Sequence, residues 1–418
     1  MHRREKDKIY MIRFLVPYME FLRVPQVSWL LVFGALARLP YSMYPLAMIL
    51  VVQRNTGSLA VAGIVAGSAA LGYALFGPLL GRLVDRYGQF RVLVGTAVAN
   101  FAIFAALLIA VISDTSPVIL VALAFAAGGS LPPVASCQRA LWPVVIRSAE
   151  LLNVAFAVEV MLLDAFLIVG PAIVTVLVTL ATPEVALGVS AAMIAVGTLG
   201  FAASPLSRAS RGNSVRKLLV GLGPLAAPGI RTLIVVTALT FLALGLIRVG
   251  LVAFAEERST INVSGLLFTA LGVGSLAGSL GFGAITWRLA MRVRYVLLLA
   301  GFALVTLPLS VASTLPVMAV LVVLAGSCLG PVTICEMNLM RDCAPEGSLT
   351  ECYAWAITAT YAGAAAGNAL GGSSPVACSL LLPATRESAS PTWRKILHCP
   401  VLTSAGTLWG RLQVPKRG

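Results

Sequence analysis

Residues 81–91 read GRLVDRYGQFR, a short charged segment between two long apolar stretches. The segment holds four charged side chains, although only 11% of the residues in the whole chain are charged. Gly81 and Gly88 flank the single acid, Asp85, and predict a tight turn, since glycine adopts backbone conformations that other residues avoid. A charged loop between two membrane-length segments is therefore the first candidate functional element.

The composition predicts a membrane protein. Of the 418 residues, 59% are hydrophobic, and the mean hydropathy is +0.95. A soluble domain is about 25% charged, and a membrane helix needs about 20 mainly apolar residues. We predict eleven spans, at residues 28–52, 59–80, 92–113, 117–138, 153–181, 184–205, 232–255, 262–286, 293–313, 315–335 and 352–372.

The net charge of +14 indicates orientation rather than nucleic-acid binding. If the basic N-terminal segment 1–26 lies in the cytoplasm, nearly all Lys and Arg residues of the loops fall on the same side, and only Arg54 and Arg258 fall on the other. This is the positive-inside pattern of multi-pass proteins. Residues 1–26 also lack the apolar core of a cleavable signal peptide. We expect a multi-pass protein of the cell membrane with a cytoplasmic N-terminus.

Cysteine and histidine give no sign of a metal site or an enzyme. The seven cysteines form no CxxC or Cys/His ligand spacing, and the two histidines, His2 and His398, lie near opposite ends of the sequence. No His/Asp/Glu cluster and no nucleophile–base pattern stands at a predicted membrane face. We therefore expect no metal, no cofactor and no enzyme activity.

An internal repeat divides the chain into two halves. The segment GGSLPPVASCQRAL from Gly128 aligns without gaps to GSCLGPVTICEMNL from Gly326, and Gly170 aligns with Gly367 in the following helices. The stretch 206–231 is basic and rich in Ser, Gly and Pro, as expected of a cytoplasmic linker. The predicted organisation is therefore a six-helix half at 27–205, the linker, and a second half at 232–372.

The second half is one helix short. The repeat places a twelfth helix at about 381–402, but that window contains several charges and three prolines. A charge at the bilayer centre costs roughly 2.5–3.5 kcal/mol on insertion scales. We interpret 373–418 as an aberrant polar tail produced by a frameshift or a mispredicted end, and the alternative is a genuine polar tail after an eleven-helix variant.

The segment 81–91 resembles the loop 2–3 signature of the major facilitator superfamily of membrane transporters. The signature reads G-x-L-a-D-R-x-G followed by basic residues, and the matching positions are Gly81, Leu83, Asp85, Arg86 and Gly88, with Arg91 as the only cation after them. The resemblance, closest in character to bacterial efflux-type permeases, implies an all-α polytopic fold of two six-helix halves. In this chain eleven helices are evident, and helix 12 is missing or altered.

The resemblance also gives the loop a gating role. When the cytoplasmic side is closed, Asp85 can accept hydrogen bonds from the free N-terminal NH groups of a neighbouring helix or from an arginine. Arg86 and Arg91 can bind acidic lipid headgroups or helix ends. Arg82 fits an ordinary cation of a positive-inside loop.

Two cations within the predicted spans are candidates for substrate binding. Arg38, followed by Tyr41, lies near the middle of helix 1, and Arg248 lies at a similar place in helix 7. The resemblance implies that these helices line a central cavity, where the cations and Tyr41 would meet an anionic substrate. The alternative is that each arginine closes a buried ion pair.

Glu159 and Asp164 are the two acids deepest in a predicted span, both in helix 5. Five residues correspond to about 500° of helix, so the two side chains point roughly 140° apart and cannot form one carboxylate pair. Buried carboxyl groups exchange protons near neutrality, which makes both candidates for proton coupling, with Asp164 the better one. Glu159 is expected to pair with a cation in the cytoplasmic half, and Glu336 is expected at the interface.

Prolines within the spans predict hinges. Pro133 and Pro331 should break hydrogen bonding in helices 4 and 10. Gly170-Pro171 in helix 5 is similar to part of the helix-5 signature of drug antiporters, in which this dipeptide bends the helix.

The sequence thus predicts a transporter that moves a small solute by alternating access. The expected activity is proton-coupled efflux of an amphipathic or anionic compound, with protons and membrane lipid as further partners. The alternatives are an uptake permease for a sugar or organic acid, and a non-transporting product that lacks helix 12.

Overall fold

The computed structural model describes residues 16–113, 115–210, 223–257, 262–285, 287–312 and 314–373. All regular secondary structure in these ranges is helical. A short helix over 16–23 precedes the main bundle. The helices of the N-terminal half are α2 (Val27–Arg38), α3 (Pro40–Thr56), α4 (Leu59–Tyr87), α5 (Gln89–Ile112), α6 (Pro117–Gly129), α7 (Val134–Val145), α8 (Ala149–Leu180) and α9 (Pro183–Ala202).

The C-terminal half has longer, less divided helices. After α10 (Pro205–Ala209) and the short 3₁₀ helix η1 (Gly223–Ala226), it contains α11 (Pro228–Glu257), α12 (Asn262–Ala284), α13 (Met291–Thr306), η2 (Leu307–Val311), α14 (Leu315–Cys343) and α15 (Leu349–Ser373). Within the described ranges, ten helical segments are long and apolar enough to cross a membrane. The predicted eleventh span is the helix α15, which is less apolar than the other ten. The predicted helix-12 window, 381–402, lies outside the described residues.

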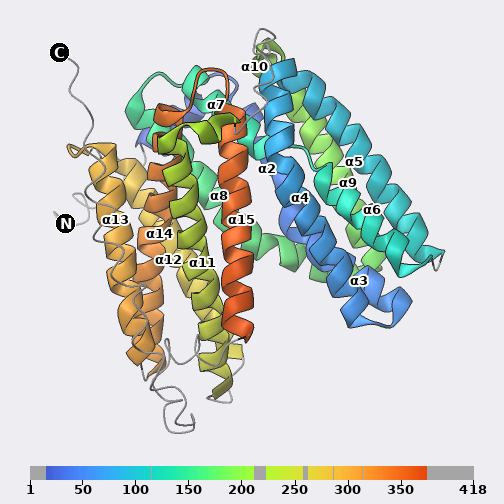
Figure 1. The fold of residues 1–418 in the computed structure, drawn as a ribbon. Helices are drawn as coiled ribbons and strands as arrows, with labels where there is room; N and C mark the ends of the chain where they lie inside the picture. Colours follow the sequence, from blue (N-terminus) through green and yellow to red (C-terminus); the bar gives the residue numbers. More distant parts are fainter. Residues whose placement is uncertain are drawn as a thin grey trace, which may run out of the picture.

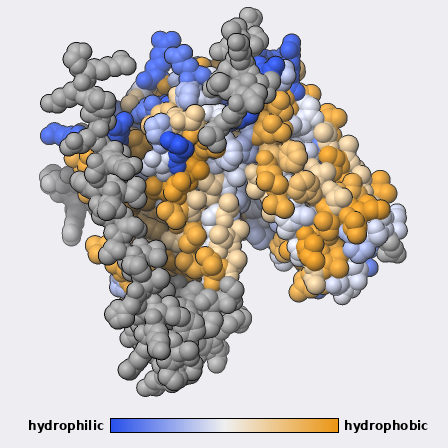
Figure 2. Space-filling view, in the orientation of Figure 1, coloured by the Kyte–Doolittle hydropathy of each residue, from blue (hydrophilic) through white to orange (hydrophobic). Residues whose placement is uncertain are grey.

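The two halves meet at one end of the bundle and separate at the other (Figure 1). Contacts between them come from α4 against α15 and from α8 against α12 and α14. The end where the C-terminus of α4 meets the N-terminus of α15 is called the Asp85 end. Figure 2 shows hydrophilic residues gathered at this end, apolar residues along the flanks, and a hollow between the halves at the opposite end.

Local sequence signals fix where several helices begin. The side chains of Ser58, Ser148 and Thr182 precede α4, α8 and α9 and accept hydrogen bonds from backbone NH groups of the first turn. Such N-caps satisfy donors that have no partner within the helix. Pro117 and Pro183 occupy the first helical position, where the missing NH costs nothing.

Glycines of the repeat serve the same packing role in both halves. A Cβ on Gly128 would overlap the backbone carbonyl of Ala69 on α4, and a Cβ on Gly326 would overlap that of Leu271 on α12. Therefore α6 packs closely on α4, and α14 packs closely on α12. Equivalent glycines at equivalent helix crossings support the duplication.

The predicted hinge at Pro133 lies in a real break, because α6 ends at Gly129 and α7 begins at Val134. Polar side chains satisfy the backbone groups that this break frees: Tyr41 donates to the Pro132 carbonyl, and Asn100 Nδ2 donates to the Ala127 carbonyl at 2.8 Å. The break is thus stabilised from two neighbouring helices.

The other two predicted hinges are continuous helix. Pro171 lies inside α8 and Pro331 inside α14, with no interruption in either helix. Pro331 still removes one backbone hydrogen bond from its helix, and its role as a hinge stays a prediction. Glycine at position 170 allows α8 to pack closely on α3, because a Cβ there would lie 2.0 Å from Ser42 Oγ.

The segment 81–91 is mostly helix rather than loop. Helix α4 runs to Tyr87 and α5 begins at Gln89, so Gly88 alone separates them, with a φ of 88°. Gly88 therefore makes the tight turn as expected, whereas Gly81 lies inside α4. Charged residues can extend these helices because the Asp85 end projects beyond the apolar part of the bundle.

Candidate functional site

Asp85 binds the N-terminus of α15. Its carboxylate accepts a hydrogen bond from the Glu351 NH at 2.9 Å and a longer one from the Thr350 NH at 3.3 Å. The first turn of a helix has free NH groups and a partial positive charge, so a carboxylate is its natural partner. This contact joins the two halves, and it is of the kind expected for Asp85 from its sequence.

Two neighbours of Asp85 strengthen the same contact. Arg82 Nη2 lies 2.7 Å from Glu351 Oε1, and Arg82 Nε also donates to this oxygen at 3.0 Å. A Cβ on Gly81 would lie 2.9 Å from the Ala354 Cβ and from the Glu351 Cα. Arg82 is therefore more than a loop cation, and Gly81 is required for close approach rather than for a turn.

The remaining basic residues of the segment take no part in this contact. The Arg86 guanidinium lies 5.2 Å from the ring centroid of its neighbour Tyr87. Arg91 is exposed in the first turn of α5. Their binding to lipid headgroups or helix ends stays a prediction.

Arg38 is closed in a buried ion pair rather than open to a cavity. Only 3% of Arg38 is exposed, and its Nη1 lies 2.6 Å from Glu159 Oε2. Gln138 Oε1 accepts from the same nitrogen at 3.3 Å, and Trp142 Nε1 donates to the other Glu159 oxygen at 3.2 Å. The buried ion pair, the alternative considered for Arg38, is therefore the arrangement that the structure shows, and the open-cavity placement of Arg38 is wrong.

A second cation lies beside this pair. Arg139 Nε is 4.0 Å from Glu159 Oε2, and only 6% of Arg139 is exposed. Across the interface between halves, Glu336 on α14 is equally buried, and its charge acts on Arg139. The predicted span 117–138 ends just before Arg139, whereas the helix α7 continues to Val145. Glu336 is buried between helices, and its depth at the membrane interface stays a prediction.

Asp164 faces the other half of the protein. Ser275 of α12 and Arg248 of α11 are the groups that act on its carboxylate, and its Oδ2 atom is buried with no hydrogen-bond partner among the described residues. The two carboxylates of α8 therefore serve different halves, as the 140° angle between them predicts. Arg38 and Arg248 each oppose a carboxylate of α8, rather than facing each other.

Tyrosines line the space between the halves, on the side of the Asp85 contact that faces the hollow. Tyr41 meets Tyr73 edge to face at 6.0 Å, and Tyr73 meets Tyr361 of α15 in the same way at 5.5 Å. Tyr361 is 50% exposed although it stands within the bundle, because it borders the hollow between the halves. Aromatic edges and faces of this kind are suited to a ring-containing ligand.

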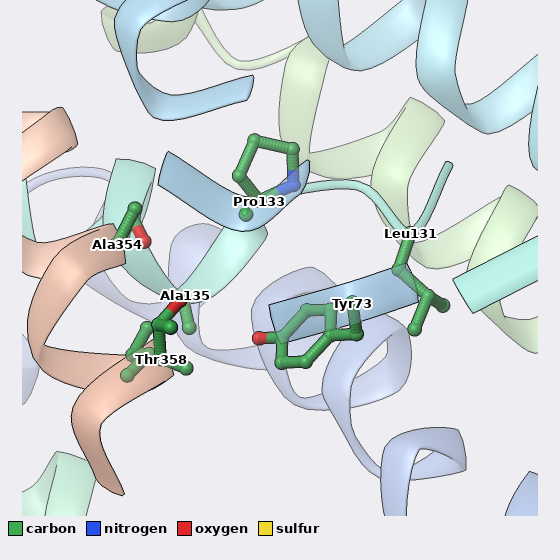
Figure 3. Close-up of a pocket in the computed structure, with 9 residues that line it drawn as sticks. Tyr73, Leu131, Pro133, Ala135, Ala354 and Thr358 are labelled. Carbon is green, nitrogen blue, oxygen red and sulfur yellow. The ribbon is translucent and has the colours of Figure 1, made fainter. Parts of the chain in front are cut away.

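A small recess lies beside this tyrosine row (Figure 3). It is lined by Tyr73 and Gly77 from α4, by Leu131, Pro133, Ala135 and Ser136 from the break in helix 4 and the start of α7, and by Ala354, Ile357 and Thr358 from α15. Thr358 Oγ1 donates to the Ala74 carbonyl at 3.1 Å, which ties the two walls together. The predicted hinge at Pro133 is thus also part of the wall of the recess.

Sequence reasoning missed Arg139, Tyr73 and Tyr361. Charged residues are scarce within the spans, so Arg139 would have been a candidate site residue if the predicted helix 4 had extended past residue 138. The tyrosines gave no such signal, because a tyrosine in an apolar span is common. In the part of the chain that the structure describes, no group of three or more His, Cys, Asp or Glu residues could hold a metal ion.

Comparisons with known proteins agree with this architecture. The sequence profile of the Major Facilitator Superfamily matches residues 30–368. A bacterial homologue of the iron transporter ferroportin, solved in an outward-facing state with soaked iron, superposes with a TM-score of 0.67 at 16% identity, covering 85% of this chain and 94% of its own. The human organic anion transporter MFSD10 superposes with a TM-score of 0.64 at 15% identity, covering 86% and 96%. A search among curated proteins found no match.

Proposed function

Because the chain belongs to the major facilitator superfamily and is a multi-pass membrane protein, we propose that it is a transporter rather than an enzyme, and that it exports a small amphipathic or anionic compound in exchange for protons. The proposal has three parts: alternating access, an anion-selective cavity and a proton-coupling carboxylate. Each part rests on a different group of residues.

The observation that carries the proposal is the contact between Asp85 and the N-terminus of α15. It ties the halves at one end, while Tyr361 is half exposed to the hollow at the other. If the Asp85 end faces the cytoplasm, as the distribution of basic residues favours, this is an outward-facing conformation. Breaking the contact would then open the cavity to the cytoplasm, so Asp85, with Gly81, Arg82 and Glu351, would set the balance between the two states.

Charge and aromatic character support the proposed substrate class. Three arginines, Arg38, Arg139 and Arg248, act electrostatically on the hydroxyl of Tyr361, which borders the hollow. A ring-containing compound would find an aromatic partner at Tyr361, and the positive field of these arginines favours a compound with an acidic group. The human relative of similar fold is an organic anion transporter, which agrees with this class.

Asp164 is the proposed proton-coupling group. Its carboxylate has one buried oxygen without a hydrogen-bond partner in the described part of the chain and lies in the field of Arg248 on the other half. Movement of α11 relative to α8 would change the distance between this acid and Arg248. Proton binding would then favour one state and proton release the other.

Proteoliposomes with an imposed pH gradient test the proposal. The vesicles carry a pH-sensitive dye in the lumen, and the proton flux is measured while a panel of aromatic acids, their neutral amides, sugars and short organic acids is added. Flux of protons against an aromatic acid is expected. Flux in the direction of solute uptake, with sugars or short organic acids, would establish the rival permease.

Asp164→Asn separates coupling from binding. The variant is expected to bind the transported compound but to lose transport driven by the pH gradient, because it can no longer exchange a proton. Glu150→Gln is the matched control, since Glu150 is an exposed acid in the first turn of the same helix. Proton-driven flux that is unchanged in Asp164→Asn excludes this residue as the coupling group.

A further inference from the structure

The short helix over residues 16–23, which we call the strap, contacts both halves of the protein at the Asp85 end. Phe21 is fully buried and meets Trp142 of α7 edge to face, with ring centroids 5.5 Å apart. Tyr18, one turn earlier, donates from its hydroxyl to the Leu280 carbonyl of α12 at 2.8 Å. Phe21 therefore anchors the strap in the N-terminal half, and Tyr18 ties it to the C-terminal half.

The contact with α12 belongs to the interface that closes the Asp85 end. Both α7 and α12 end there, as α4 does, because successive spans run in opposite directions (Figure 1). Gly283 lies one turn after Leu280, and a Cβ on Gly283 would lie 2.7 Å from the Tyr18 hydroxyl oxygen and 2.9 Å from the Ala157 Cβ of α8. The strap, α8 and α12 thus meet at one point. The Tyr18 contact can form only while the halves are together at this end.

A second face of the strap is apolar and exposed. Met19 and Leu22 are 52% and 51% exposed, and Val16 continues the same row towards the N-terminus. Residues three apart lie on one face of a helix, so this row is separate from the face of Tyr18 and Phe21. Within the described part of the chain, the outer row is left facing outward, and it is suited to an apolar partner.

The surrounding chain indicates that this partner is the surface of the membrane. The first span begins with α2, whose Trp29 is 47% exposed, and exposed tryptophans are typical of the boundary between bilayer and water. Gln26, with a φ of 70°, makes the turn between the strap and α2. Residues 1–26 contain six Lys or Arg and three Asp or Glu, a balance that anionic headgroups attract. An apolar helix face with basic neighbours is the pattern of a helix that lies in the membrane interface.

We propose that the strap lies on the membrane surface through Val16, Met19 and Leu22, and that through Tyr18 and Phe21 it holds the two halves together in the conformation closed at the Asp85 end. The partner of the outer face is the boundary between headgroups and acyl chains in a leaflet that contains anionic lipid. The inference goes beyond the proposed transport activity and does not depend on which compound is moved.

Lipid binding then favours the closed state by keeping the strap ordered. An isolated helix of eight residues is marginal in water, so a strap released from α12 would gain conformational freedom in the open state. The membrane surface holds the strap helical in both states and removes that gain. Anionic lipid is therefore expected to raise the closed population.

Spin-label accessibility in nanodiscs tests the outer face. Single labels replace Met19, Leu22 or Glu20 in a background with the native cysteines replaced. The probes are oxygen, which concentrates in the bilayer, and a neutral nickel chelate, which stays in water. Val32 on α2, 63% exposed within a span, is the bilayer reference, and Glu346, exposed at the Asp85 end, is the water reference.

We expect the oxygen-to-chelate ratio at Met19 and Leu22 to lie near that of Val32, and the ratio at the exposed Glu20 to lie near that of Glu346. Water-like ratios at Met19 and Leu22 would overturn the membrane contact. Low access to both probes would also overturn it, because it would mean that another part of the chain or a second copy covers this face.

Distances between spin labels at Arg91 and Glu346, exposed positions on different halves, test the strap itself. They are measured in the full-length protein and in Asp85→Asn, which is expected to populate the open state. Tyr18→Phe removes only the hydroxyl and should lower the ratio of closed to open protein about fivefold, which corresponds to about 1 kcal/mol, the size of a net hydrogen bond. Tyr87→Phe, at an exposed tyrosine near the same end, should leave the ratio unchanged. An unchanged ratio for Tyr18→Phe in both backgrounds would overturn the strap.

Lipid composition tests the coupling between the two faces. Nanodiscs of phosphatidylglycerol should give a higher closed population than nanodiscs of phosphatidylcholine. Arg23→Gln, at the exposed cation of the strap, should weaken this rise, because each Lys or Arg near an anionic surface contributes to binding. Arg54→Gln, at an exposed cation of the opposite end, should leave it unchanged. A closed population that does not respond to lipid charge would overturn the anionic partner. None of these measurements uses a transported compound, so the strap can fail while the transport proposal stands, and the reverse.

Discussion

Asp85→Asn is expected to shift the protein from its closed conformation at the Asp85 end to an open one. The carboxylate accepts a good hydrogen bond at 2.9 Å and a long one at 3.3 Å, both from the first turn of α15. Asparagine keeps one acceptor but loses the charge and the second acceptor. A hydrogen bond to a charged group contributes about 1.5–3 kcal/mol, and a charge at a helix N-terminus is typically worth about 0.3–1 kcal/mol.

We expect the closed state to lose stability by an amount near the lower part of the range for a hydrogen bond to a charged group. Glu351 itself lies beside Asp85 and repels it, although Arg82 neutralises much of that charge. A loss of about 1.5–2 kcal/mol changes the ratio of closed to open protein roughly tenfold to thirtyfold, since 1.4 kcal/mol corresponds to a factor of ten. Asp85→Glu keeps the charge and should shift the ratio less.

Electron–electron distance measurements follow this shift directly. Spin labels at Arg91 and Glu346, exposed positions on different halves near the Asp85 end, report their separation in a background with the native cysteines replaced. A longer-distance population should grow in Asp85→Asn. An Arg82→Gln control should have a smaller effect, because one third of the Arg82 side chain is exposed and such pairs contribute at most about 1 kcal/mol. Identical distance distributions in Asp85→Asn and the unmodified protein would refute the reasoning.

Three further outcomes follow from the packing and charge pairs. Gly81→Ala should favour the open state by about 1–3 kcal/mol, because the new Cβ would overlap α15. Gly63→Ala in the same helix is the control: its Cβ would lie in open space, so the spin-label distances should not change. Glu159→Gln should destabilise the protein by about 3–5 kcal/mol, because it leaves Arg38 buried without its charged partner. Thermal unfolding in detergent measures this loss, and Glu184→Gln, which breaks the exposed Arg54–Glu184 pair, is the control. An unfolding midpoint that Glu159→Gln lowers no more than the control contradicts the prediction. Tyr41→Phe should destabilise the protein by about 0.5–1.5 kcal/mol and so lower the unfolding midpoint, because it removes one of the two hydrogen bonds that the Pro132 carbonyl accepts, the other coming from the Val134 NH. An unchanged midpoint would contradict this.

The helices could be predicted from the sequence because the physical signal is long and regular. Apolar runs of membrane length placed most helices to within a few residues, and the helical angle between Glu159 and Asp164 correctly separated their surroundings. The partner of Asp85 was predictable in kind, as a helix N-terminus, but not in identity. Only the fold brings α15, more than 260 residues away in sequence, to α4.

The errors have common physical causes. Hydropathy does not mark where a helix ends, so the predicted span stops at residue 138 and leaves out Arg139, although α7 continues to Val145. Whether a proline interrupts its helix depends on the hydrogen-bond donors that neighbouring helices supply. Tyr41 and Asn100 donate to backbone carbonyls at the break near Pro133, whereas Pro331 lies within a continuous helix. The edge-to-face row of tyrosines joins different helices, and no pattern within a single helix reveals it.

The interrupted helix 4 and the uninterrupted helix 10 make the two halves mechanically unequal. A common way to derive the opposite state of a duplicated transporter is to give each half the conformation of the other. In this protein that exchange would require α14 to open between Ser327 and Val332, the positions aligned with Gly129 and Val134, although α14 is continuous there. The second state should therefore be reached mainly by bending within the N-terminal half, with the C-terminal half moving as a stiffer body.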